Sequence, residues 1–504
     1  MSIDKIVGIE QEYAIALAGG VHYDPVELSF LLVNSYEKFT RTIWDYDQES
    51  PLLDARGFRR DGEEAVISNK ANFRINNLLP NGARYYVDHA HPEFSTPECR
   101  TARDVVAVDR AGELILLKSV ERAESTTAYR NILVLKNNSD QKGNSYGTHE
   151  NYLVETPTYN KLFPKYPSPP IFNLTYLVPF LVTRQIICGA GKVGSENGTG
   201  KVDYQISQRA DFFETVMGGQ TTHTRPIVNT RDEPHADKAR FSRLHVIIGD
   251  ANMSETTAML KVGTMQIVLR MIEDDYLNED LTLEDPVQAL LAISHDPTCK
   301  QTVKLKTGLS MTAVQIQKCF LERAGEYLEE HKINEDTGLQ EVWSLWKDTL
   351  EKLEREPMAL NKRVDWVIKK WLMERKMARI DASWRDARIR RMDILYHDIR
   401  RERGLFYVLE ADNRVERIHD NDDRSKQFVD RSPEDTRAFF RSQCLKRYRD
   451  RITHANWDAL TFEADNGAEK KIPLPDPRKG TINHVGEILK KSPDTETLLS
   501  HLGT

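Results

Sequence analysis

Residues 83–93, ARYYVDHAHPE, place an arginine, two tyrosines, an aspartate, two histidines and a glutamate in a stretch that otherwise has the pattern of a β-strand. Side chains alternate between the two faces of a strand. Arg84, Tyr86 and Asp88 are therefore predicted to project to one side, and the two residues between them to the other. Groups that resist burial would then line one surface of a sheet, as a catalytic or binding surface requires.

A second predicted strand, VGIEQEYAI at residues 7–15, has the same character. Alternation puts Glu10 and Glu12 on one face together with the small residues Gly8 and Ala14. The opposite, core-facing side carries the apolar set Val7, Ile9, Tyr13 and Ile15. Two carboxylates flanked by residues with almost no side chain leave room for a bulky group above them.

Neighbouring carboxylates repel each other unless a cation lies between them. Carboxylate oxygens without thiolates and with few imidazoles favour Mg²⁺ or Mn²⁺ over Zn²⁺, and Mg²⁺ usually shares its coordination shell with substrate phosphates. Arg84, Arg209 and Arg231 are candidates to hold such phosphates. The alternative is a sheet whose polar face is simply hydrated.

His89 and His91 form an H-x-H pair that, with Glu93, offers a zinc site. Pro92 favours an extended His91 and is expected to end the strand. The sequence nearby supplies no convincing third imidazole. We therefore favour two hydrogen-bonding histidines over a zinc site.

Residues 188–201, CGAGKVGSENGTGK, have the composition of a phosphate-binding loop. They do not match the pattern G-x-x-x-x-G-K-[ST], because Val202 follows Lys201 and Ser195 stands where the first glycine belongs. We predict a glycine-rich turn between strands instead.

Length and composition indicate a folded protein of two domains. The chain has 504 residues, 39% of them hydrophobic and 29% charged, and single cores stop growing near ~250–300 residues. The five cysteines are widely spaced and form no C-x-x-C pair, which favours a reducing compartment. The N-terminus lacks the pattern of a signal peptide and no apolar stretch is long enough for a membrane span. We expect a cytoplasmic protein that does not bind membranes.

The net charge of −7 argues against a general nucleic-acid binder. Residues 379–403 nevertheless contain eight arginines, which could bind an acidic partner through charge-assisted hydrogen bonds. The favoured interpretation is a solvated helix face with i,i+4 pairs such as Asp381 with Arg385.

The first 250 residues read mainly as strands and the next 150 mainly as helices. Predicted strands include residues 5–15, 83–90, 131–138 and 243–251. Capping-box patterns at Asn252 with Glu255 and at Thr312 with Gln315 predict two helix starts. A third helix runs through Leu339, Val342, Trp346, Leu350 and Leu353 and is terminated by Pro357. A polar stretch then predicts a boundary between a catalytic domain, 1–425, and a small C-terminal domain, 426–504.

Long motifs of this sequence resemble, in order, those of the bacterial Pup ligase and Pup deamidase/depupylase enzymes, distant relatives of glutamine synthetase and the carboxylate-amine ligases. The resemblance runs through nearly the whole chain and includes GIEQEY (8–13), NGARYYVDHAHPEFSTPE (81–98), KNNSDQKGNSYGTHENYL (136–153), ISQRADFFE (206–214), NTRDEPHAD (229–237) and RLHVIIGDANMSE (243–255). It implies an α+β fold: a glutamine synthetase-like large domain, with a mainly antiparallel curved sheet packed against helices, and a small C-terminal domain.

The two branches of this family run opposite reactions. The ligase uses ATP to join the C-terminal glutamate side chain of the ubiquitin-like protein Pup to a target lysine. The deamidase/depupylase converts the C-terminal glutamine of Pup to glutamate and cleaves the Pup–lysine isopeptide bond, with a nucleotide kept as cofactor. Either branch implies Pup and its conjugates as partners, and Mg²⁺ with ATP, or ADP plus phosphate, as cofactors.

Two features favour the deamidase branch. The step from Asp88 to Glu93 is five residues, whereas the ligase pattern has one more. Residues 42–84 also resemble an insertion that marks the deamidase and is lacking in the ligase, although residues 67–75 depart from it. That departure leaves open a variant that acts on a divergent modifier.

The resemblance assigns roles by motif. Asp88 matches the catalytic carboxylate, acting as nucleophile or as general base. The magnesium positions are matched by Glu10, Tyr86 and Glu93, and the nucleotide contacts by Arg84, Thr96 and Trp457. The strand-face argument adds Glu12 as a metal ligand, and the glutamine synthetase-like pattern adds His245. Asp88 must be ionised, which Mg²⁺ and Arg84 are expected to favour.

Four other functions remain open. The Pup ligase would form a conjugate and ADP, and a small-molecule carboxylate-amine ligase would need no protein partner. A zinc hydrolase would ignore nucleotide. A nonenzymatic Pup-binding adaptor would release nothing, and the intact set of Glu10, Asp88 and Glu93 argues against it.

Overall fold

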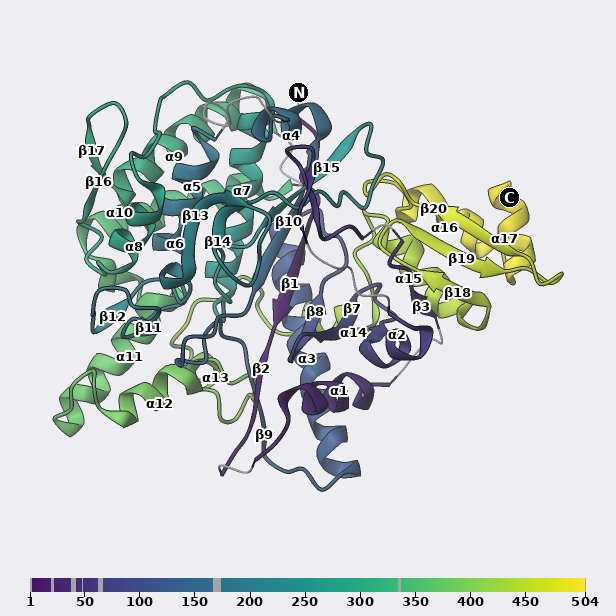
Figure 1. Cartoon of the computed structure of the whole chain (residues 1–504), viewed down its shortest axis with the longest axis horizontal. Coiled ribbons are helices and arrows are strands. Elements are labelled where there is room, and N and C mark those ends of the chain that lie inside the picture. The colour runs from purple at the N-terminus through teal and green to yellow at the C-terminus, as the bar shows by residue number, and fades with distance from the viewer. Residues whose placement is uncertain are drawn as a thin grey trace.

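Segments far apart in the chain meet in a six-stranded sheet at the centre of the molecule (Figure 1). The computed structural model describes residues 2–19, 22–37, 42–47, 49–61, 67–165, 174–333 and 337–503. The strand order is β15-β10-β1-β8-β7-β6, and each neighbouring pair is antiparallel. The bounds are β1 Val7–Glu12, β6 Asn76–Leu78, β7 Arg84–Asp88, β8 His91–Ser95, β10 Thr148–Glu155 and β15 Phe241–Val246. The predicted α+β class with a mainly antiparallel sheet is confirmed.

The predicted faces of β1 and β7 are confirmed as well. Val7 and Ile9 are buried in the core, as is Tyr85, whereas Glu10 and Asp88 keep part of their surface exposed. Beyond Glu12 the chain continues as β2 (Ala14–Leu17), which pairs with the predicted strand β9 (Ile132–Leu135). Each strand thus buries its apolar side chains on one side and presents its polar ones on the other.

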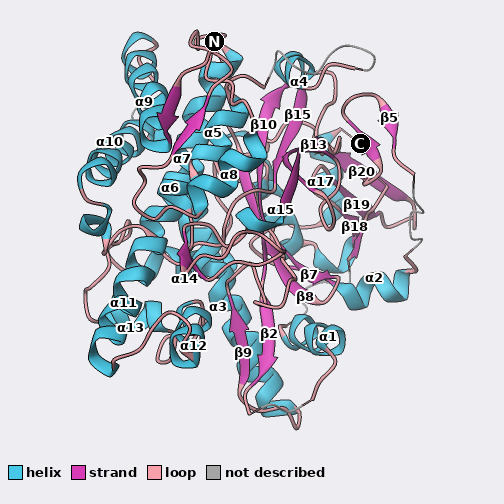
Figure 2. Ribbon diagram, turned by 60° about the vertical axis from the view of Figure 1, so that its left-hand side comes forward, coloured by secondary structure: helices cyan, strands magenta, loops and turns pink. Residues whose placement is uncertain are grey.

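Three helices cover the core face of the sheet. Helix α1 (Pro25–Ser35) packs on β7 and β8, α3 (Ala102–Thr126) on β1, and α7 (Glu255–Glu273) on β10. In Figure 2 most helices of the second half of the chain lie to the left of these strands. These helices pack on the side of the sheet that carries the apolar residues, opposite the face of Glu10 and Asp88.

The helices of the middle region follow the predicted starts and stops, with one correction. Helix α9 (Ala313–Glu330) begins with the predicted capping box of Thr312 and Gln315, and α10 (Leu339–Arg355) ends just before Pro357. Helix α7, however, is capped by Ser254 and not by Asn252. The Asn252 amide donates instead to the Cys188 carbonyl oxygen and to Asp365, so tertiary contacts override the local pattern.

Further elements surround this frame. Short helices are α4 (Thr156–Leu162), α5 (Leu177–Thr183), α6 (Gln185–Cys188), α8 (Pro286–Ser294), α13 (Leu405–Ala411) and α14 (Asp423–Asp430), with 3₁₀ turns at Ala210–Phe212, Pro357–Leu360 and Arg449–Arg451. Two-stranded ladders are β4 (Leu53–Asp54) with β5 (Phe58–Arg59), β11 (Lys192–Val193) with β12 (Tyr204–Gln205), β13 (Phe213–Gly218) with β14 (Arg225–Asn229), and β16 (Thr302–Lys304) with β17 (Ser310–Thr312). The predicted glycine-rich turn is confirmed, because residues 194–203 connect β11 to β12.

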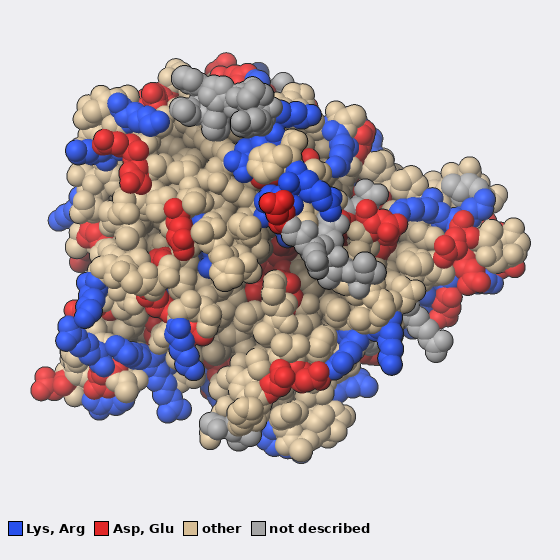
Figure 3. All heavy atoms as spheres, viewed as in Figure 1, with Lys and Arg blue, Asp and Glu red and all other residues tan. Residues whose placement is uncertain are grey.

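The arginine-rich segment 379–403 is not one helix. Helix α11 (Asp365–Ile380) stops at Asp381, which has φ of +48°, and α12 (Ala387–Tyr396) starts after a turn. Asp381 and Arg385 therefore do not form the expected i,i+4 helix pair, and Arg388 pairs with Asp386 instead. Lysine and arginine side chains gather over α11 and α12 at the lower left of Figure 3.

A second hydrophobic core lies at the C-terminal end of the chain. Its sheet has the order β20-β19-β18-β3, so β3 (Ile43–Trp44) of the insertion joins strands from the end of the chain. The other elements here are α2 (Asn69–Ile75), α15 (Ala438–Arg447), β18 (Ile452–Ala455), β19 (Ala459–Glu463), β20 (Glu469–Pro473), α16 (Ile482–Lys490) and α17 (Thr495–Leu502). Phe428 and Val429 still pack in the larger core, so we propose a domain boundary after α14.

None of the helices in the described ranges is both long and apolar enough to cross a membrane. All five cysteines are free thiols, and four of them are buried.

Candidate active site

The register of the sheet brings the predicted acidic residues together. Glu12 on β1 is the Cα partner of Glu93 on β8, which in turn is the partner of Tyr86 on β7. Asp88, two residues beyond Tyr86, joins them: one carboxylate oxygen each of Glu12, Asp88 and Glu93 lie within 4.8 Å of one another. Three carboxylates from three neighbouring strands therefore converge on one point, as cross-strand neighbours on one face must.

The hairpin between β7 and β8 sets this geometry. Strand β7 ends at Asp88, His89 takes a left-handed conformation with φ of +50°, and β8 begins at His91. The expectation that Pro92 ends the strand is wrong, because it is the second residue of β8. Proline is tolerated at the beginning of a strand. The tight turn leaves Asp88 at the rim of the sheet and Glu93 inside it.

Burial and the negative charges of neighbouring carboxylates raise the pKa of Glu93 and of the neighbouring Tyr86. Burial raises the pKa of Glu93 well above its usual range, and the charges of Asp88, Glu12 and Glu10 add to the shift. Burial also raises the pKa of Tyr86, followed by the effect of Glu93, so this side chain remains a phenol. Like charges held together in this way indicate a site built for a cation.

Glu12 is kept ionised by its own partners. Burial by itself would raise the pKa of Glu12, but His91, whose Nδ1 lies 3.1 Å from the carboxylate, and the Gly147 N–H lower it to about 2. Gly147 donates to Glu12 Oε1 over 2.7 Å. A Cβ at residue 147 would lie 2.6 Å from that oxygen and 2.3 Å from His149 Nε2, so only glycine fits here.

Asp88 is the accessible carboxylate of the cluster. Its side chain is 41% exposed, against 11% for Glu12, and His89 Nδ1 lies 3.0 Å from Asp88 Oδ1. The hydrogen bond to Asp88 raises the pKa of His89 to about 9, so the ring is a cation at neutral pH. The predicted role of Arg84 beside Asp88 is wrong. Arg84 lies at the other end of β7 and donates to Asn76 and Tyr46.

A second group of possible metal ligands lies one step along β1. Glu10 is the Cα partner of His149 on β10, and one ligand atom each of Glu10, His149 and His245 fall within 4.8 Å of one another. His245 Nδ1 lies 3.3 Å from Asn229 Oδ1, whereas its buried Nε2 has no hydrogen-bond partner among the described residues and lies 3.7 Å from Glu10. Burial lowers the pKa of His245 to about 3, so the ring is neutral, as a metal ligand must be.

Glu10 remains a carboxylate in this group. Burial by itself would raise the pKa of Glu10, but the imidazoles of His149 and His245 hold it well below its usual range.

Both groups have the donor chemistry of a metal site. The three carboxylates match the all-oxygen shell that Mg²⁺ prefers, and their mutual repulsion is what a divalent cation would relieve. The set of Glu10 and two imidazoles would accept Mn²⁺ or Zn²⁺ more readily than Mg²⁺. His89 and His91, for which we favour hydrogen bonding over a zinc site, belong to neither group.

A cavity of about 470 Å³ opens beside the carboxylates. Glu12 and Asp88 form one wall, and two loops at residues 143–147 and 221–225 form the others together with Arg209 and Phe212. In Figure 3 acidic atoms are visible in the hollow at the centre of the molecule. The cavity is large enough for the end of a polypeptide chain.

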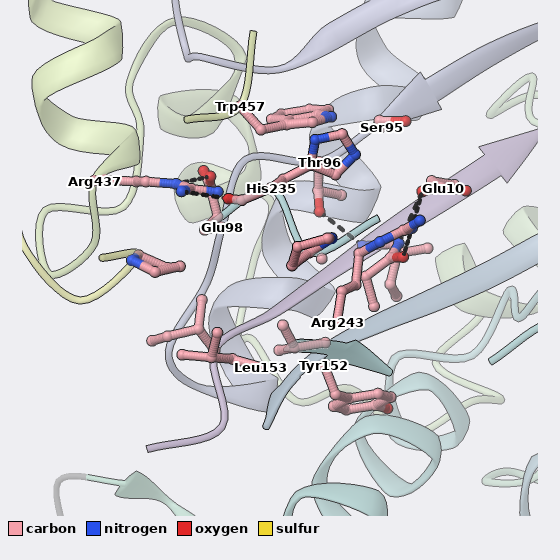
Figure 4. A pocket seen from close by; sticks show the side chains of 17 residues that line it. Glu10, Ser95, Thr96, Glu98, Tyr152, Leu153, His235, Arg243, Arg437 and Trp457 are labelled. Carbon is pink, nitrogen blue, oxygen red and sulfur yellow. Dashed lines mark hydrogen bonds and ion pairs between the residues drawn. The ribbon is translucent and has the colours of Figure 1, made fainter. Parts of the chain in front are cut away.

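A separate cavity of about 100 Å³ lies between the large domain and the C-terminal elements. It is lined by Gly8, Glu10 and Thr96 from the sheet and by Arg437 and Trp457 from the C-terminal part. In Figure 4 Trp457 and His235 lie on one side of this cavity, opposite Tyr152 and Leu153. The indole of Trp457 at this narrow slot, which also reaches Glu10, offers an aromatic face on which a planar ring could stack.

The nucleotide residues expected from the sequence divide into two pairs. Thr96 and Trp457 line the small cavity, whereas Arg84 and Arg231 are not among its described lining residues. Arg84 is covered by Trp44, whose ring lies 4.2 Å from its guanidinium and touches Trp457 at 5.2 Å between centroids. Arg231 Nε lies 3.7 Å from Glu233. Arg84 thus packs against Trp44, which in turn packs against the cavity residue Trp457.

Sequence reasoning overlooked three residues of these sites. His149 and Arg243 follow from the alternation already used for β1 and β7, because His149 and Asn151 share a face, as do Arg243 and His245. Arg243 lines the small cavity and its Nη1 lies 3.7 Å from Glu10. His235 carried no comparable signal, because a loop places it.

Comparison with known proteins agrees with this geometry. Residues 5–461 match the Pup-ligase protein family. The chain belongs to the Pup-ligase family. It is 40% identical to a depupylase of Acidothermus cellulolyticus over 99% of both chains, and 37% identical to a Pup deamidase/depupylase of Mycolicibacterium smegmatis over 99% of this chain and 100% of that one. A Pup–protein ligase of Kribbella flavida is 40% identical over 82% of this chain and 90% of its own.

Solved structures of the Pup-ligase family share the fold. A complex between Pup and its ligase PafA has a TM-score of 0.79 at 32% identity, covering 97% of this chain and 92% of that one. PafA in complex with ADP has a TM-score of 0.72 at 33% identity, covering 86% of this chain and 96% of that one.

Proposed function

We propose that this member of the Pup-ligase family is a nucleotide-dependent hydrolase that deamidates the C-terminal glutamine of Pup and cleaves the Pup–lysine isopeptide bond. One observation carries the proposal: Asp88, the exposed carboxylate of a three-carboxylate cluster, faces a cavity of about 470 Å³ beside a second cavity suited to a nucleotide. The full-length similarity to depupylases supports this branch, since the Pup–protein ligase aligns over a smaller share of the chain.

Each group of residues in the site has a separate role in the proposed amide hydrolysis. Asp88 supplies the nucleophile or general base, and the protonated His89 lies beside it, with 3.0 Å between Nδ1 and Asp88 Oδ1. Glu12 and Glu93, with Tyr86 against Glu93, would hold Mg²⁺, and Glu10 with His149 and His245 would hold a second cation. A bound divalent cation supplies positive charge where the reacting carbonyl becomes negative. Water adds to the carbonyl carbon and the amine leaves as ammonia or as the target lysine.

The nucleotide is proposed to bind between the two domains. Trp457 would stack on the base, Thr96 would lie beneath it, and Arg243 would hold phosphate near Glu10. Arg84 and Arg231, assigned by motif, would act from outside this cavity. The ADP complex of PafA, a relative of the same fold, supports a nucleotide as ligand. We place the enzyme in the cytoplasm, a reducing compartment that suits its five free thiols.

The test is a product analysis by intact mass. The enzyme is incubated with glutamine-ended Pup and with a Pup–lysine conjugate, each with and without ATP and Mg²⁺. We expect a gain of about one mass unit for the first substrate and release of free Pup from the second, both dependent on nucleotide. When Asp88→Asn is tested in this assay, Asp450→Asn is the matched control, because the Asp450 side chain is 92% exposed.

The Pup ligase is the second candidate, because a Pup–protein ligase is as identical to this chain as the depupylase is. The same assay separates them. Formation of a conjugate from glutamate-ended Pup, ATP and a lysine-bearing target, with stoichiometric ADP and no hydrolysis, would replace the hydrolase proposal.

A further inference from the structure

Two arginines in the large cavity lack the partner that buried arginines elsewhere in the protein have. Three arginines are among the largest fully buried side chains, Arg184, Arg209 and Arg441. Arg184 is paired with Glu150 at 2.6 Å, and Arg441 is paired with Glu98. Arg209 is only 1% exposed and, among the residues that the structure describes, no carboxylate lies within ion-pairing distance of it.

Its neighbour Arg225, at the start of β14, is half-buried and likewise has no carboxylate within ion-pairing distance among the described residues. Both guanidiniums are bonded to neutral oxygens: Arg209 Nε to Ser145 Oγ at 3.3 Å, Arg209 Nη1 to the Ile247 carbonyl, Arg225 Nη2 to the Ser145 carbonyl at 2.7 Å and Arg225 Nε to the Thr221 carbonyl at 2.8 Å. Ser145 thus lies between the two cations. All three residues line the cavity that contains Asp88.

An unpaired buried charge is costly, so a site of this kind is normally completed by an anion. Burial, and then the adjacent charge of Arg225, lower the pKa of Arg209 to about 10, which leaves both side chains cationic at neutral pH. Asp88, Glu12 and Glu214 line the same cavity. The charges of Glu12 and Glu214 act on Arg225, but no ion pair joins either carboxylate to the two arginines among the described residues. The cationic side chains therefore still have room for an anionic group of a ligand.

We propose that Arg209 and Arg225 bind the α-carboxylate of the C-terminal residue of the modifier while the side-chain amide of that residue reaches Asp88. This inference rests on the proposed function and names the group by which the substrate is recognised. A C-terminal glutamine and an isopeptide-linked C-terminal glutamate share a free α-carboxylate, whereas an internal glutamine has none. The arginine pair would confine hydrolysis to the last residue and serve both reactions.

The position of the pair favours a carboxylate over a phosphate. Arg209 and Arg225 line the cavity on the Asp88 side, which shares no described lining residue with the small cavity of Thr96 and Trp457. Arg243 is the arginine of the small cavity and lies 3.7 Å from Glu10. The nucleotide phosphates would thus meet Arg243, and the pair is left for the polypeptide substrate.

The experiment compares two substrates: Pup ending in glutamine with a free α-carboxylate, and the same chain with an α-carboxamide. Charge-assisted hydrogen bonds to two guanidiniums predict that wild-type enzyme hydrolyses the amidated chain about 30-fold or more slowly in kcat/KM. Arg225→Gln should slow hydrolysis of the free-acid chain by about the same factor, mainly through KM, and leave the amidated chain within about threefold of wild type. Arg122→Gln, an exposed arginine on α3, should retain the full difference between substrates.

The outcomes separate this inference from the proposed function. No hydrolysis of either chain by wild-type enzyme would remove the proposed function itself. Equal hydrolysis of both chains by wild-type enzyme, or an unchanged preference in Arg225→Gln, would overturn the arginine assignment and leave the hydrolase intact. Should Arg225→Gln bind ADP more weakly than wild type, the measurement is made with Arg209→Gln, and a full preference in that variant would overturn the assignment equally. If Arg225→Gln requires added inorganic phosphate for activity, and the wild-type enzyme hydrolyses both chains equally, the arginine pair would be assigned to phosphate instead.

Discussion

Glu12 on β1 and Glu93 on β8 face each other as a cross-strand pair, with carboxylate oxygens that lie within 4.8 Å of each other and of Asp88. Like charges opposite each other destabilise a sheet, so the pair is retained at the expense of stability. A divalent cation between the carboxylates would convert this repulsion into attraction.

Glu93→Gln should therefore stabilise the metal-free protein and remove most of its response to magnesium. We expect the melting temperature without metal to rise by about 1–2 °C, since relief of one repulsive contact is on the order of 1 kcal/mol. Thermal scans with EDTA and with Mg²⁺ measure both effects. The control Glu463→Gln alters an exposed glutamate of β19. A metal response as large in Glu93→Gln as in wild type would argue against Glu93 as a ligand.

Trp457 should contribute to nucleotide affinity through base stacking. Replacement of a stacking aromatic by alanine costs about 1–3 kcal/mol, so Trp457→Ala should weaken ADP binding about 5- to 150-fold. Trp457→Phe should recover most of the loss. Isothermal titration measures the affinities. Equal ADP affinity in Trp457→Ala and wild type would place the base elsewhere.

Glu98 should make the junction of the two domains sensitive to acid. Burial by itself would raise its pKa, but Arg441 and Arg437 on either side lower the pKa of Glu98 to about 2. Because this folded-state pKa lies below the unfolded value near 4.5, the stabilisation is fully present above pH 5. It is lost as the pH falls from about 5 to 2.

The size of this effect is testable by urea unfolding at several pH values. Glu98→Gln should lower the free energy of unfolding at pH 7 by about 3 kcal/mol, because it leaves two buried arginines short of a counter-ion. The variant should also lose less stability than wild type between pH 5 and pH 3. Parallel acid dependence in both proteins would show that Glu98 is not the responsible group.

The alternative to a solvated surface at residues 379–403 is that the arginines over α11 and α12 hold an acidic Pup-like chain, and the salt dependence of binding tests it. The exposed members of this surface are Arg379, Arg385, Arg388, Arg390, Arg391 and Arg403. We expect the Kd for Pup to rise about tenfold or more between 50 and 300 mM salt, and this dependence to become shallower in Arg379→Gln combined with Arg390→Gln. Fluorescence anisotropy measures the Kd for Pup at each salt concentration in wild type and in the double variant. Affinity that does not change with salt would exclude this surface.

The sequence predicts the acidic sheet face well because alternation along a strand is a local property. Glu10, Glu12 and Asp88 lie on the faces predicted by alternation, whereas Glu93 was assigned by motif. The same rule applied to residues 148–153 and 241–246 would have added His149 and Arg243. The pairing of Arg209 with Arg225 is different in kind. Arg209 lies just before the 3₁₀ turn Ala210–Phe212 and Arg225 begins β14, and the two meet through Ser145, a contact that only the folded chain defines.

Two other differences also have tertiary causes. Arg84 was expected beside Asp88, but residues 43–46 of the insertion fold over it, and Trp44 and Tyr46 take its guanidinium. Asn252 resembles a helix cap by sequence alone, yet Asp365 on α11 engages it and Ser254 caps the helix instead. Local sequence patterns predicted the helices and strands. Contacts with residues far away in the sequence determined where the Arg84 and Asn252 side chains bind.

The central claim is that Asp88 is the reacting carboxylate, and Asp88→Asn tests it most directly. The change removes one charge from a side chain that is 41% exposed, so we expect the melting temperature and ADP affinity to stay close to wild type. Release of ammonia from glutamine-ended Pup and of Pup from its conjugate should fall below about one-thousandth of the wild-type rate. Turnover within tenfold of wild type would contradict the account.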